Sequence, residues 1–460
     1  MKGTSWQIWI DTGGTFTDCL ATAPSGDVRR LKILSSSVLR GTIIKRIGPR
    51  LLQVSMVWPT PKDIYAGFAF RMIGSSFHGT IKSVHLEHSI IELDKPLPGK
   101  LTTGFEITTA EEVPVLAARI LTGTPLQNPF PPIEMKLGST RGTNALLERK
   151  GARTALLVTA GFRDLLTIGN QQRPDLFTLN IRKTVPLYDL VIPVAERIDA
   201  NGEVLLPLSD EMIREVIRDL KKRKIESVAV AFLNSYRNPI HEQQLGAALQ
   251  TAGFSFVSLS TALSRQIKIV PRAETAVANA YLDPIIRKYV DGIRSGLSLA
   301  RLSIMTSAGS LVRSDSFYPK DSLLSGPAGG VVGAAHQALQ SGIHHMIAFD
   351  MGGTSTDVSL YNNRYDYRFE SRVGNFSILS PSLSIETIAA GGGSICDFDG
   401  HRFTVGPHSA GASPGPACYG AGGPLTITDV NLLLGRLDPD YFVIPIQKEH
   451  AASALERLLI

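Results

Sequence analysis

One short pattern occurs twice in this chain, as Asp11-Thr-Gly-Gly-Thr-Phe-Thr-Asp18 and as Asp350-Met-Gly-Gly-Thr-Ser-Thr-Asp357. Each copy follows an apolar run, at residues 6–10 and 346–349, so each predicts a strand that turns sharply at a Gly-Gly pair. Glycine tolerates positive φ, and its backbone N–H can approach a phosphate oxygen closely. The repeat therefore predicts two phosphate-binding hairpins that face one nucleotide.

The aspartate that begins each pattern is the candidate metal ligand. Mg²⁺ prefers one or two carboxylates together with waters and phosphate oxygens. Asp11 and Asp350 are therefore expected to hold a hydrated Mg²⁺, and one of them is a candidate to orient or deprotonate the attacking nucleophile. Turns alone often contain Asp and Gly, but recurrence of the whole pattern in the same register favours a nucleotide site.

The composition is that of a large soluble enzyme. With 460 residues, 43% of them hydrophobic, the chain can bury substantial cores and is expected to form two or more domains. The net charge of +6 is modest, and the compact basic run at residues 221–224 lies at the end of a predicted helix, where cations complement the helix dipole. No aromatic residues interleave with this run, so no nucleic-acid partner is expected.

Cysteine usage and the lack of long apolar segments bear on location. Cys19, Cys396 and Cys418 form neither a paired framework nor a Cys-x-x-Cys metal motif. The apolar run before Asp11 is too short for a signal-peptide core, and no run approaches the length of a membrane span. The sequence therefore predicts a cytoplasmic protein without a membrane partner.

The elements around the two motifs follow an α/β pattern. Residues 1 to about 40 are expected to form the opening hairpins of a mixed sheet. Residues 41 to about 137 are interpreted as an inserted β-rich module that ends in a helix near residues 109–121. Beyond them helices and buried strands alternate, including an amphipathic helix at 209–224 that Ser209 caps. This alternation predicts an α/β fold.

A helix of small residues is expected at Ser325 to Ala334, just before the second hairpin. The order hairpin, helix, strand, second hairpin resembles the actin, heat-shock-protein and sugar-kinase superfamily, in which such a helix forms the interdomain hinge. The resemblance implies two ribonuclease-H-like lobes of the actin-like ATPase type, carrying the inserted β-rich module. A tightly packed helix without a hinge role is the alternative.

Further segments carry a more specific pattern, at residues 138–151, 161–165, 173–176, 324–330, 349–358, 389–394, 406–419, 428–431 and 434–436. They resemble the hydantoinase A / 5-oxoprolinase family. The resemblance covers most of residues 1–40 and 138–440, whereas 41–137 lies outside the common pattern. It implies a hydantoinase/oxoprolinase N-terminal region at 1–205 and a hydantoinase A-type region at 206–460.

Members of that family open a cyclic amide at the expense of ATP, converting 5-oxoproline to glutamate or hydantoins to carbamoyl amino acids. Phosphorylation of the lactam oxygen makes it a leaving group, so that water can add and the ring can open. The resemblance thus implies conversion of 5-oxo-L-proline to L-glutamate with ADP and phosphate, using ATP and Mg²⁺. A hydantoinase A-type subunit, a sugar or acid kinase and a non-catalytic nucleotide-binding module are the alternatives.

The resemblance also implies roles for the candidate site residues. Asp11 and Asp350 position Mg²⁺, and Asp18 and Asp357 brace the turns or the waters of the metal. The expected phosphate-binding residues are Gly13, Gly14, Thr15, Thr17, Gly352, Gly353, Thr354 and Thr356. A further candidate ligand loop, equally consistent with a tight turn between strands, consists of Gly391, Gly392 and Gly393.

Three polar residues are weaker candidates for contacting the substrate. These are Arg173, Asp175 and Asn144, although Asn144 is more consistent with a helix cap. Thr12 stands where oxoprolinase-like members usually carry Arg, and Glu386 matches neither subgroup. Hydantoin therefore stays open as the alternative substrate.

Cysteine and histidine residues outside the hairpins are expected to be structural. Cys418 is interpreted as a buried residue rather than a nucleophile. His85 and His88 lack helical metal-ligand spacing and are expected on strands of the inserted module, on opposite faces.

The family pattern extends further than this chain does. Its glycine-rich adenosine loop and final helices are expected beyond residue 460, and the sequence contains no hydantoinase B-type half. The chain is therefore expected to be a fragment or one part of a longer polypeptide, inactive alone. The expected partners are a small cyclic amide, a hydantoinase B-type subunit or fused domain, and further copies in an oligomer.

Overall fold

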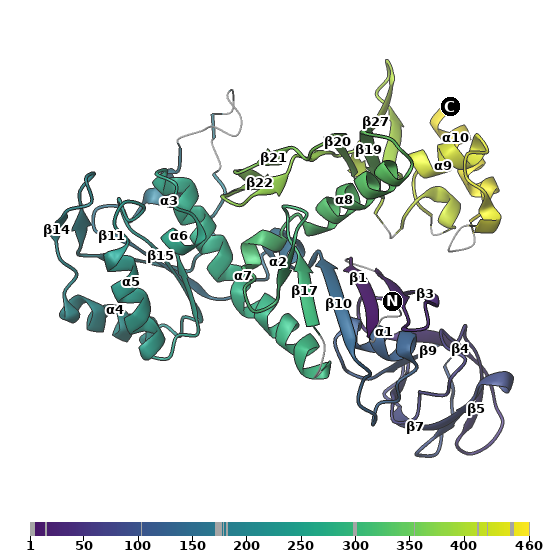
Figure 1. The fold of residues 1–460 in the computed structure, drawn as a ribbon. Helices are drawn as coiled ribbons and strands as arrows, with labels where there is room; N and C mark the ends of the chain where they lie inside the picture. The colour runs from purple at the N-terminus through teal and green to yellow at the C-terminus, as the bar shows by residue number, and fades with distance from the viewer. Residues whose placement is uncertain are drawn as a thin grey trace. The chain divides into compact units, whose positions relative to one another are not determined.

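The structure is a computed structural model that describes residues 5–13, 16–102, 104–170, 177, 179–180, 183–297, 301–353, 355–411, 414–420, 422–441 and 446–459. The chain divides into two compact units (Figure 1). Unit 1 comprises Met1–Gly326 and Arg368–Ser382, and unit 2 comprises Pro327–Tyr367 and Leu383–Ile460. Across the described residues, no helix has both the length and the apolar character needed to cross a membrane.

Unit 1 is built around a six-stranded mixed sheet with the strand order β18-β17-β10-β1-β2-β3. β1 and β2 form the predicted first hairpin, β3 continues it antiparallel, and β10 and β17 extend the other side in parallel. The strands are Trp6–Thr12 (β1), Phe16–Thr22 (β2), Val28–Leu34 (β3), Ile133–Ser139 (β10), Arg301–Met305 (β17) and Leu311–Arg313 (β18).

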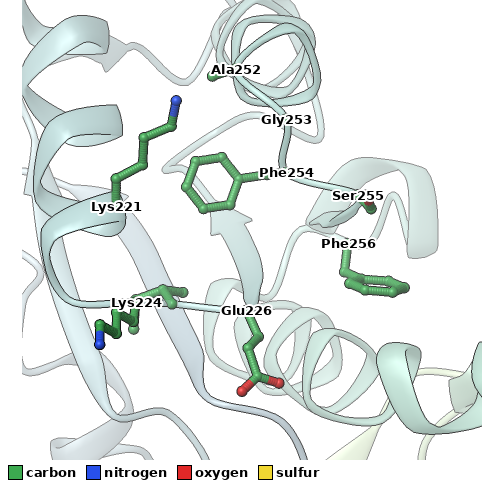
Figure 2. A pocket seen from close by; sticks show the side chains of 9 residues that line it. Lys221, Lys224, Glu226, Ala252, Gly253, Phe254, Ser255 and Phe256 are labelled. Carbon is green, nitrogen blue, oxygen red and sulfur yellow. The ribbon is translucent and has the colours of Figure 1, made fainter.

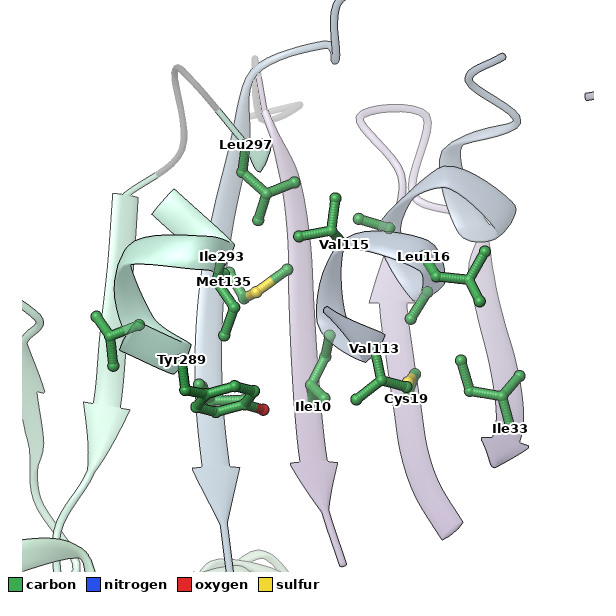
Figure 3. Packing of buried hydrophobic residues seen from close by; sticks show 14 of the residues in the cluster. Ile10, Cys19, Ile33, Val113, Val115, Leu116, Met135, Tyr289, Ile293 and Leu297 are labelled. Carbon is green, nitrogen blue, oxygen red and sulfur yellow. The ribbon is translucent and has the colours of Figure 1, made fainter. Parts of the chain in front are cut away.

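Two helices, α1 (Val113–Thr122) and α7 (Ile269–Gly296), pack against this sheet (Figure 3). Alternate residues of β1 are buried, which is the pattern of a strand with one face toward a core. Ile10 lies in that core with Leu116 of α1 and Ile293 of α7, and all three are at most 3% exposed. The apolar contacts fix the sheet that carries the first hairpin.

Helix α7 has 28 residues and was not anticipated by the sequence analysis. Its first half is buried on nearly all sides and rich in alanine, so it lacks the polar and apolar stripes that mark a surface helix. Pro284 inside the helix is a second reason why the sequence did not indicate a helix here, because proline normally ends a helical pattern. The other short elements of this part are α2 (Arg141–Leu147), α3 (Leu165–Ile168), η2 (Pro319–Ser322), β22 (Ser371–Val373) and β23 (Phe376–Ile378).

A second sheet in unit 1 has four parallel strands in the order β12-β11-β15-β16 and a core of its own. The predicted helix at 209–224 is confirmed as α4, and the Ser209 hydroxyl accepts a hydrogen bond from Met212 N at 3.2 Å. Elements here are β11 (Thr154–Thr159), β12 (Leu190–Val194), β13 (Arg197–Ile198), β14 (Val204–Leu206), α4 (Asp210–Lys222), β15 (Ser227–Ala231), α5 (Ile240–Thr251), β16 (Phe256–Leu259) and α6 (Ser260–Leu263).

A closed barrel with the strand order β4-β5-β8-β7-β6-β9 occupies the first part of the stretch expected to be an inserted module. The rings of Phe70 and Phe105 stack in its core with centroids 5.2 Å apart. At the end of that stretch, β10 belongs to the main sheet and α1 packs against it. The barrel strands are Leu39–Arg46 (β4), Leu51–Ser55 (β5), Ala69–Met72 (β6), His78–His85 (β7), Ile90–Leu93 (β8) and Gly104–Thr108 (β9).

The prediction that His85 and His88 both lie on strands is wrong. His85 ends β7, but His88 belongs to the 3-10 turn η1 (Leu86–His88). The chain reverses here between two antiparallel strands, and Ser89 takes a left-handed conformation that closes the turn.

Unit 2 contains a three-stranded antiparallel sheet in the order β19-β20-β25, whose first two strands form the predicted second hairpin. The predicted small-residue helix is confirmed as α8 (Ser325–Gln340). The further elements are β19 (His345–Met351), β20 (Thr356–Asn362), β21 (Tyr367–Arg368), β24 (Ser382–Leu383), β25 (Glu386–Ile388), β26 (Ser394–Phe398), β27 (Phe403–Ser409), η3 (Ala417–Tyr419), α9 (Ile427–Leu433), η4 (Pro439–Tyr441) and α10 (Lys448–Leu459).

The predicted α/β class is confirmed by these sheets and helices. The proposed regions at 1–205 and 206–460 stay a prediction.

Candidate active site

The first hairpin pairs two carboxylates directly across its strands. Asp11 of β1 lies opposite Asp18 of β2, and Thr12 lies opposite Thr17. The turn closes where Gly13 N donates to Phe16 O at 3.0 Å. A Cβ at residue 13 would come within 2.9 Å of that same carbonyl oxygen, so the turn requires glycine. Gly14 and Thr15 lie outside the described residues.

Residues from distant segments hold this turn in place. Ser35 Oγ donates to Gly13 O at 2.9 Å and lies 2.9 Å from Thr17 Oγ1. Thr12 Oγ1 lies 3.2 Å from the hydroxyl of Tyr289 in α7. Thr17 is completely buried, so in this structure its hydroxyl supports the turn. Its expected contact with phosphate stays a prediction.

The carboxyl of Asp11 is in an unusual electrostatic environment. Partial burial first, and then the negative charge of Asp18, raise the pKa of Asp11. Asp18 is partly compensated by Lys32, whose Nζ lies 2.9 Å from it. Gly138 of β10 lies beside Asp11, and a Cβ there would come within 3.1 Å of Asp11 Oδ1. A small residue at 138 therefore leaves room for the Asp11 carboxylate.

The second hairpin repeats this geometry. Asp350 of β19 lies opposite Asp357 of β20, and Gly352 N donates to Ser355 O at 2.9 Å, as Gly13 does to Phe16. Asp357 Oδ1 accepts a hydrogen bond from Thr387 Oγ1 at 2.7 Å. The two sequence repeats therefore form the same structural motif. Thr354 lies outside the described residues.

The loop formed by Gly391, Gly392 and Gly393 contacts the tip of the second hairpin. Gly392 N donates to Gly352 O at 2.9 Å, and Gly393 N donates to Gly353 O at 2.7 Å. The structure thus brings this loop together with the second hairpin. Whether the loop itself contacts a ligand stays a prediction.

Two further residues complete this arrangement. Thr356 Oγ1 donates to Ala390 O, just before the glycine loop, so Thr356 braces its hairpin as Thr17 does in unit 1. Thr428 donates to Gly392 O from both its backbone N, at 2.7 Å, and its hydroxyl, at 2.8 Å. The sequence analysis missed Thr428 and, in the first hairpin, Ser35 and Tyr289. Residues 428–431 belong to the family pattern, but nothing local indicates the contact of Thr428 or those of Ser35 and Tyr289, because each contact joins distant parts of the chain.

The weaker candidates either have structural roles or lie outside the described residues. Asn144 is not a helix cap as expected: Thr140 occupies the cap position of α2, and Asn144 Nδ2 donates to its hydroxyl at 3.4 Å. Cys418 is completely buried, in agreement with the interpretation that it is not a nucleophile. Arg173 and Asp175 lie outside the described residues.

The described part of the chain, the hairpins included, has no group of three His, Cys, Asp or Glu side chains that could hold a metal ion. Lys221, Lys224, Phe254 and Phe256 are among the residues that line a pocket at the basic run, where Lys221 lies beside Phe254 (Figure 2). None of the predicted site residues lines it. The hairpins therefore remain the candidate active site, and their facing one nucleotide stays a prediction.

Two family models match this chain. The model described as hydantoinase/oxoprolinase N-terminal region matches residues 127–253, and the model described as hydantoinase/oxoprolinase matches residues 272–459. The second match includes the whole second hairpin and the glycine loop at 391–393.

Curated relatives support the same assignment. The 5-oxoprolinase of Saccharomyces cerevisiae is 44% identical over 340 residues, which is 67% of this chain and 26% of that protein. The acetophenone carboxylase gamma subunit of Aromatoleum aromaticum is 32% identical over 367 residues, which is 72% of this chain and 50% of that protein. The chain thus spans about a quarter of the length of the yeast relative.

Solved structures share the fold over nearly the whole chain. The ATP-dependent caprolactamase from Pseudomonas jessenii matches with a TM-score of 0.68 and 27% identity, over 99% of this chain and 59% of that one. An acetone carboxylase matches with a TM-score of 0.62 and 20% identity, over 98% of this chain and 58% of that one. At this identity the match indicates similarity of fold alone. Together with the two family models, these similarities show that the chain belongs to the hydantoinase/oxoprolinase family.

Proposed function

We propose that this chain forms the ATP-binding part of an enzyme that opens a cyclic amide at the expense of ATP. The proposed substrate is 5-oxo-L-proline, and the products are L-glutamate, ADP and phosphate. The observation that carries the proposal is the pair of matched Asp/Gly-Gly hairpins in a chain 44% identical to a yeast 5-oxoprolinase. A structural neighbour named an ATP-dependent caprolactamase supports the cyclic amide as substrate class.

The proposed architecture is a pair of ribonuclease-H-like lobes of the actin-like type, one around each hairpin. The mixed sheet of unit 1 supports this proposal, because an antiparallel three-strand meander is followed by parallel strands in the order β3-β2-β1-β10-β17. The recurrence of the hairpin in unit 2 is the second support.

Asp11 and Asp350 are the proposed ligands of a hydrated Mg²⁺. The fit is best seen at Asp11, where burial first, and then the carboxylate of Asp18 directly opposite, raise the pKa of Asp11. A divalent cation would relieve this repulsion, and Mg²⁺ is bound by one or two carboxylates plus waters. When bound, it would supply positive charge to the phosphate oxygens of ATP.

The remaining site residues have proposed roles in binding phosphate and orienting the nucleophile. The N–H groups of the glycine loop and the first N–H of each Gly-Gly turn already donate within the protein. The proposed donors to phosphate oxygens are therefore the other N–H groups of the two turns. Asp11 or Asp350 orients the attacking group, which is the lactam oxygen in the phosphorylation step. Addition of water at the activated carbon gives a tetrahedral carbon, from which the ring nitrogen leaves as an amine and takes the proton of the added water. A second water then hydrolyses the remaining acyl phosphate to the carboxylate and free phosphate.

The complete enzyme is proposed to include a hydantoinase B-type partner, as a subunit or a fused domain, and to be oligomeric. The match of this chain to 26% of the yeast 5-oxoprolinase supports this, because most of that protein lies outside the matched part.

A second candidate function is ATP-dependent carboxylation of a ketone. It is favoured by the 32% identity to an acetophenone carboxylase gamma subunit, of which this chain covers 50%.

The test is phosphate release from ATP by the natural full-length gene product, with and without 5-oxo-L-proline. Stimulation by 5-oxo-L-proline with formation of glutamate is expected, with a loss of at least about 100-fold in both Asp11→Asn and Asp350→Asn. Asp27→Asn, in the exposed turn after β2, is the matched control and should retain activity. Stimulation by acetophenone with bicarbonate, and not by any lactam, would favour the second candidate.

A further inference from the structure

Lys32 completes a row of charged side chains across the first hairpin. Asp11 of β1 lies opposite Asp18 of β2, and Asp18 in turn lies opposite Lys32 of β3. Ile33, the next residue after Lys32, points into the core of the sheet (Figure 3). Successive side chains of a strand point to opposite faces, so the charged row lies on the face away from that core.

The ammonium group of Lys32 lies beside the turn of this hairpin. Its Nζ donates to both carboxylate oxygens of Asp18 at 2.9 Å and lies 5.6 Å from the centre of the Phe16 ring. Phe16 closes the turn, because its carbonyl accepts the hydrogen bond from Gly13 N. An ammonium has three donors, and the third has no acceptor among the residues that the structure describes. Lys32 therefore presents an N–H and a positive charge next to the proposed phosphate-binding turn.

The second hairpin has the same row without the cation. Asp350 lies opposite Asp357, which lies opposite Thr387 of β25. Thr387 Oγ1 donates to Asp357 Oδ1 at 2.7 Å, so a neutral hydroxyl stands where the first hairpin has the ammonium of Lys32. Of the two matched hairpins, the first is therefore better suited to the phosphate that carries more negative charge.

The simpler explanation of Lys32 is a surface ion pair without further function. The side chains of Lys32 and Asp18 are 47% and 61% exposed, and pairs of this kind contribute little to stability. This explanation does not account for the place of the charge, which is in register with the candidate Mg²⁺ ligand Asp11 and absent from the matched row of the second hairpin. A negatively charged nucleotide would meet Asp11 and Asp18 here, and a cation in the same row lowers that repulsion.

We propose that Lys32 donates to the terminal phosphate of ATP bound at the first hairpin, and that Asp18 holds the ammonium in place for this contact. The terminal phosphate carries about two negative charges at neutral pH and an inner phosphate about one, so a single cation stabilises the terminal phosphate most. The inference rests on the proposed function for the presence of ATP, but not for the identity of the cyclic amide.

The test is nucleotide binding to the natural full-length gene product in the presence of Mg²⁺. The two ligands are ADP and an ATP analogue whose last two phosphates are joined by nitrogen, which prevents hydrolysis. Lys32→Met should weaken binding of the analogue by roughly 10- to 100-fold, the usual effect of losing a charged hydrogen bond, and binding of ADP by less than about 2-fold. Lys32→Arg keeps the positive charge and should recover part of the loss.

Lys82→Met is the matched control. Lys82 lies in β7 of the barrel, its side chain is 50% exposed, and its Nζ lies 3.9 Å from Glu92 of the neighbouring strand β8. This variant should bind both nucleotides as the wild type does. Urea unfolding checks that Lys32→Met is folded, and its midpoint should match that of Lys82→Met, because each variant loses one exposed ion pair.

The outcomes separate this inference from the proposed function. Equal binding by Lys32→Met and Lys82→Met, or equal loss of ADP and the analogue in Lys32→Met, would overturn the inference, whereas stimulation of wild-type ATP hydrolysis by a lactam would still support the proposed function. Selective loss of the analogue, in a protein whose ATP hydrolysis ignores every lactam, would support the inference and overturn the proposed function. Absence of nucleotide binding by the wild type would overturn both.

Discussion

Asp11 lies directly opposite Asp18 in the β1–β2 hairpin, so two negatively charged side chains face each other on neighbouring strands. Burial, and then the charge of Asp18, raise the pKa of Asp11 in the folded protein. The folded state therefore binds this proton more tightly than the unfolded state does. Stability from this residue is present below its unfolded pKa and is lost as the pH rises through the folded pKa.

Asp11→Asn is accordingly expected to stabilise the protein at neutral pH. Like charges directly opposite on two strands cost about 0.2–1 kcal/mol, so a gain of that size at pH 7 is expected in urea unfolding. The gain should vanish below about pH 3, where Asp11 is protonated in both states. Asp27→Asn is the control in an exposed turn. A gain that is independent of pH would contradict the role assigned to the charge.

Gly393→Ala is predicted to separate the glycine loop from the second hairpin. A Cβ at residue 393 would come within 2.9 Å of both Gly353 O and Ser409 Oγ. Gly353 O is also the atom that accepts the hydrogen bond from Gly393 N. Crowding of this kind costs about 1–3 kcal/mol, measurable as a fall in the free energy of unfolding. We also expect weaker ATP binding, because the loop and the hairpin tip would move apart.

Gly333→Ala is the matched control for this prediction. Gly333 lies in α8, and a Cβ there meets no atom within 4 Å. Alanine is favoured over glycine inside a helix by roughly 0.5–1 kcal/mol, so this variant should be slightly more stable. Equal destabilisation by both substitutions would show that the predicted clash at residue 393 is not the cause.

Much of the hairpin geometry could be predicted from the sequence because it depends on neighbours. The Asp-x-Gly-Gly pattern fixes the turn, and Ser209 caps α4 through a residue three positions away. The supports of the site could not be predicted, because Ser35, Tyr289 and Thr428 reach it from distant segments.

Closure of the barrel illustrates the same limit. Barrel closure depends on the pairing of β4 with β9, for example of Leu39 with Ile107, which no local pattern indicates. Alternation of helices and strands was sufficient for the fold class, but not for these long-range contacts.

Glu242 is predicted to be essential for the stability of unit 1. It is completely buried and accepts hydrogen bonds from Phe232 N, Ser235 Oγ, Ser260 Oγ, Thr261 N and Thr261 Oγ1 at 2.6–3.0 Å. Arg272, also completely buried, donates to Ser235 Oγ at 2.6 Å and so joins α7 to the same network. Glu242→Ala leaves these donors and a buried positive charge unpaired, which costs about 3–5 kcal/mol.

Denaturant unfolding of Glu242→Ala and Glu215→Ala tests this prediction. Glu215 is an exposed residue of α4, and its replacement should change the free energy of unfolding by no more than about 0.5 kcal/mol. Glu242→Gln keeps the shape and one acceptor oxygen, so it should fall between the two. A Glu242→Ala variant as stable as Glu215→Ala would contradict the role given to the buried network.

Cys418 is predicted to be chemically inert in the folded protein. Its side chain is completely buried and its backbone N donates to Asp429 Oδ1 at 2.7 Å. Burial first, and then the hydrogen bond and charge of Asp429, raise the pKa of the thiol to about 12. Since the thiolate is the reactive form, alkylation by iodoacetamide at pH 8 should leave Cys418 unmodified until the protein is denatured.

Mass spectrometry of native and denatured samples measures this directly, and Cys418→Ala should keep its ATP hydrolysis. Rapid native alkylation, or loss of activity in a Cys418→Ala variant that folds normally, would instead make this cysteine a candidate nucleophile.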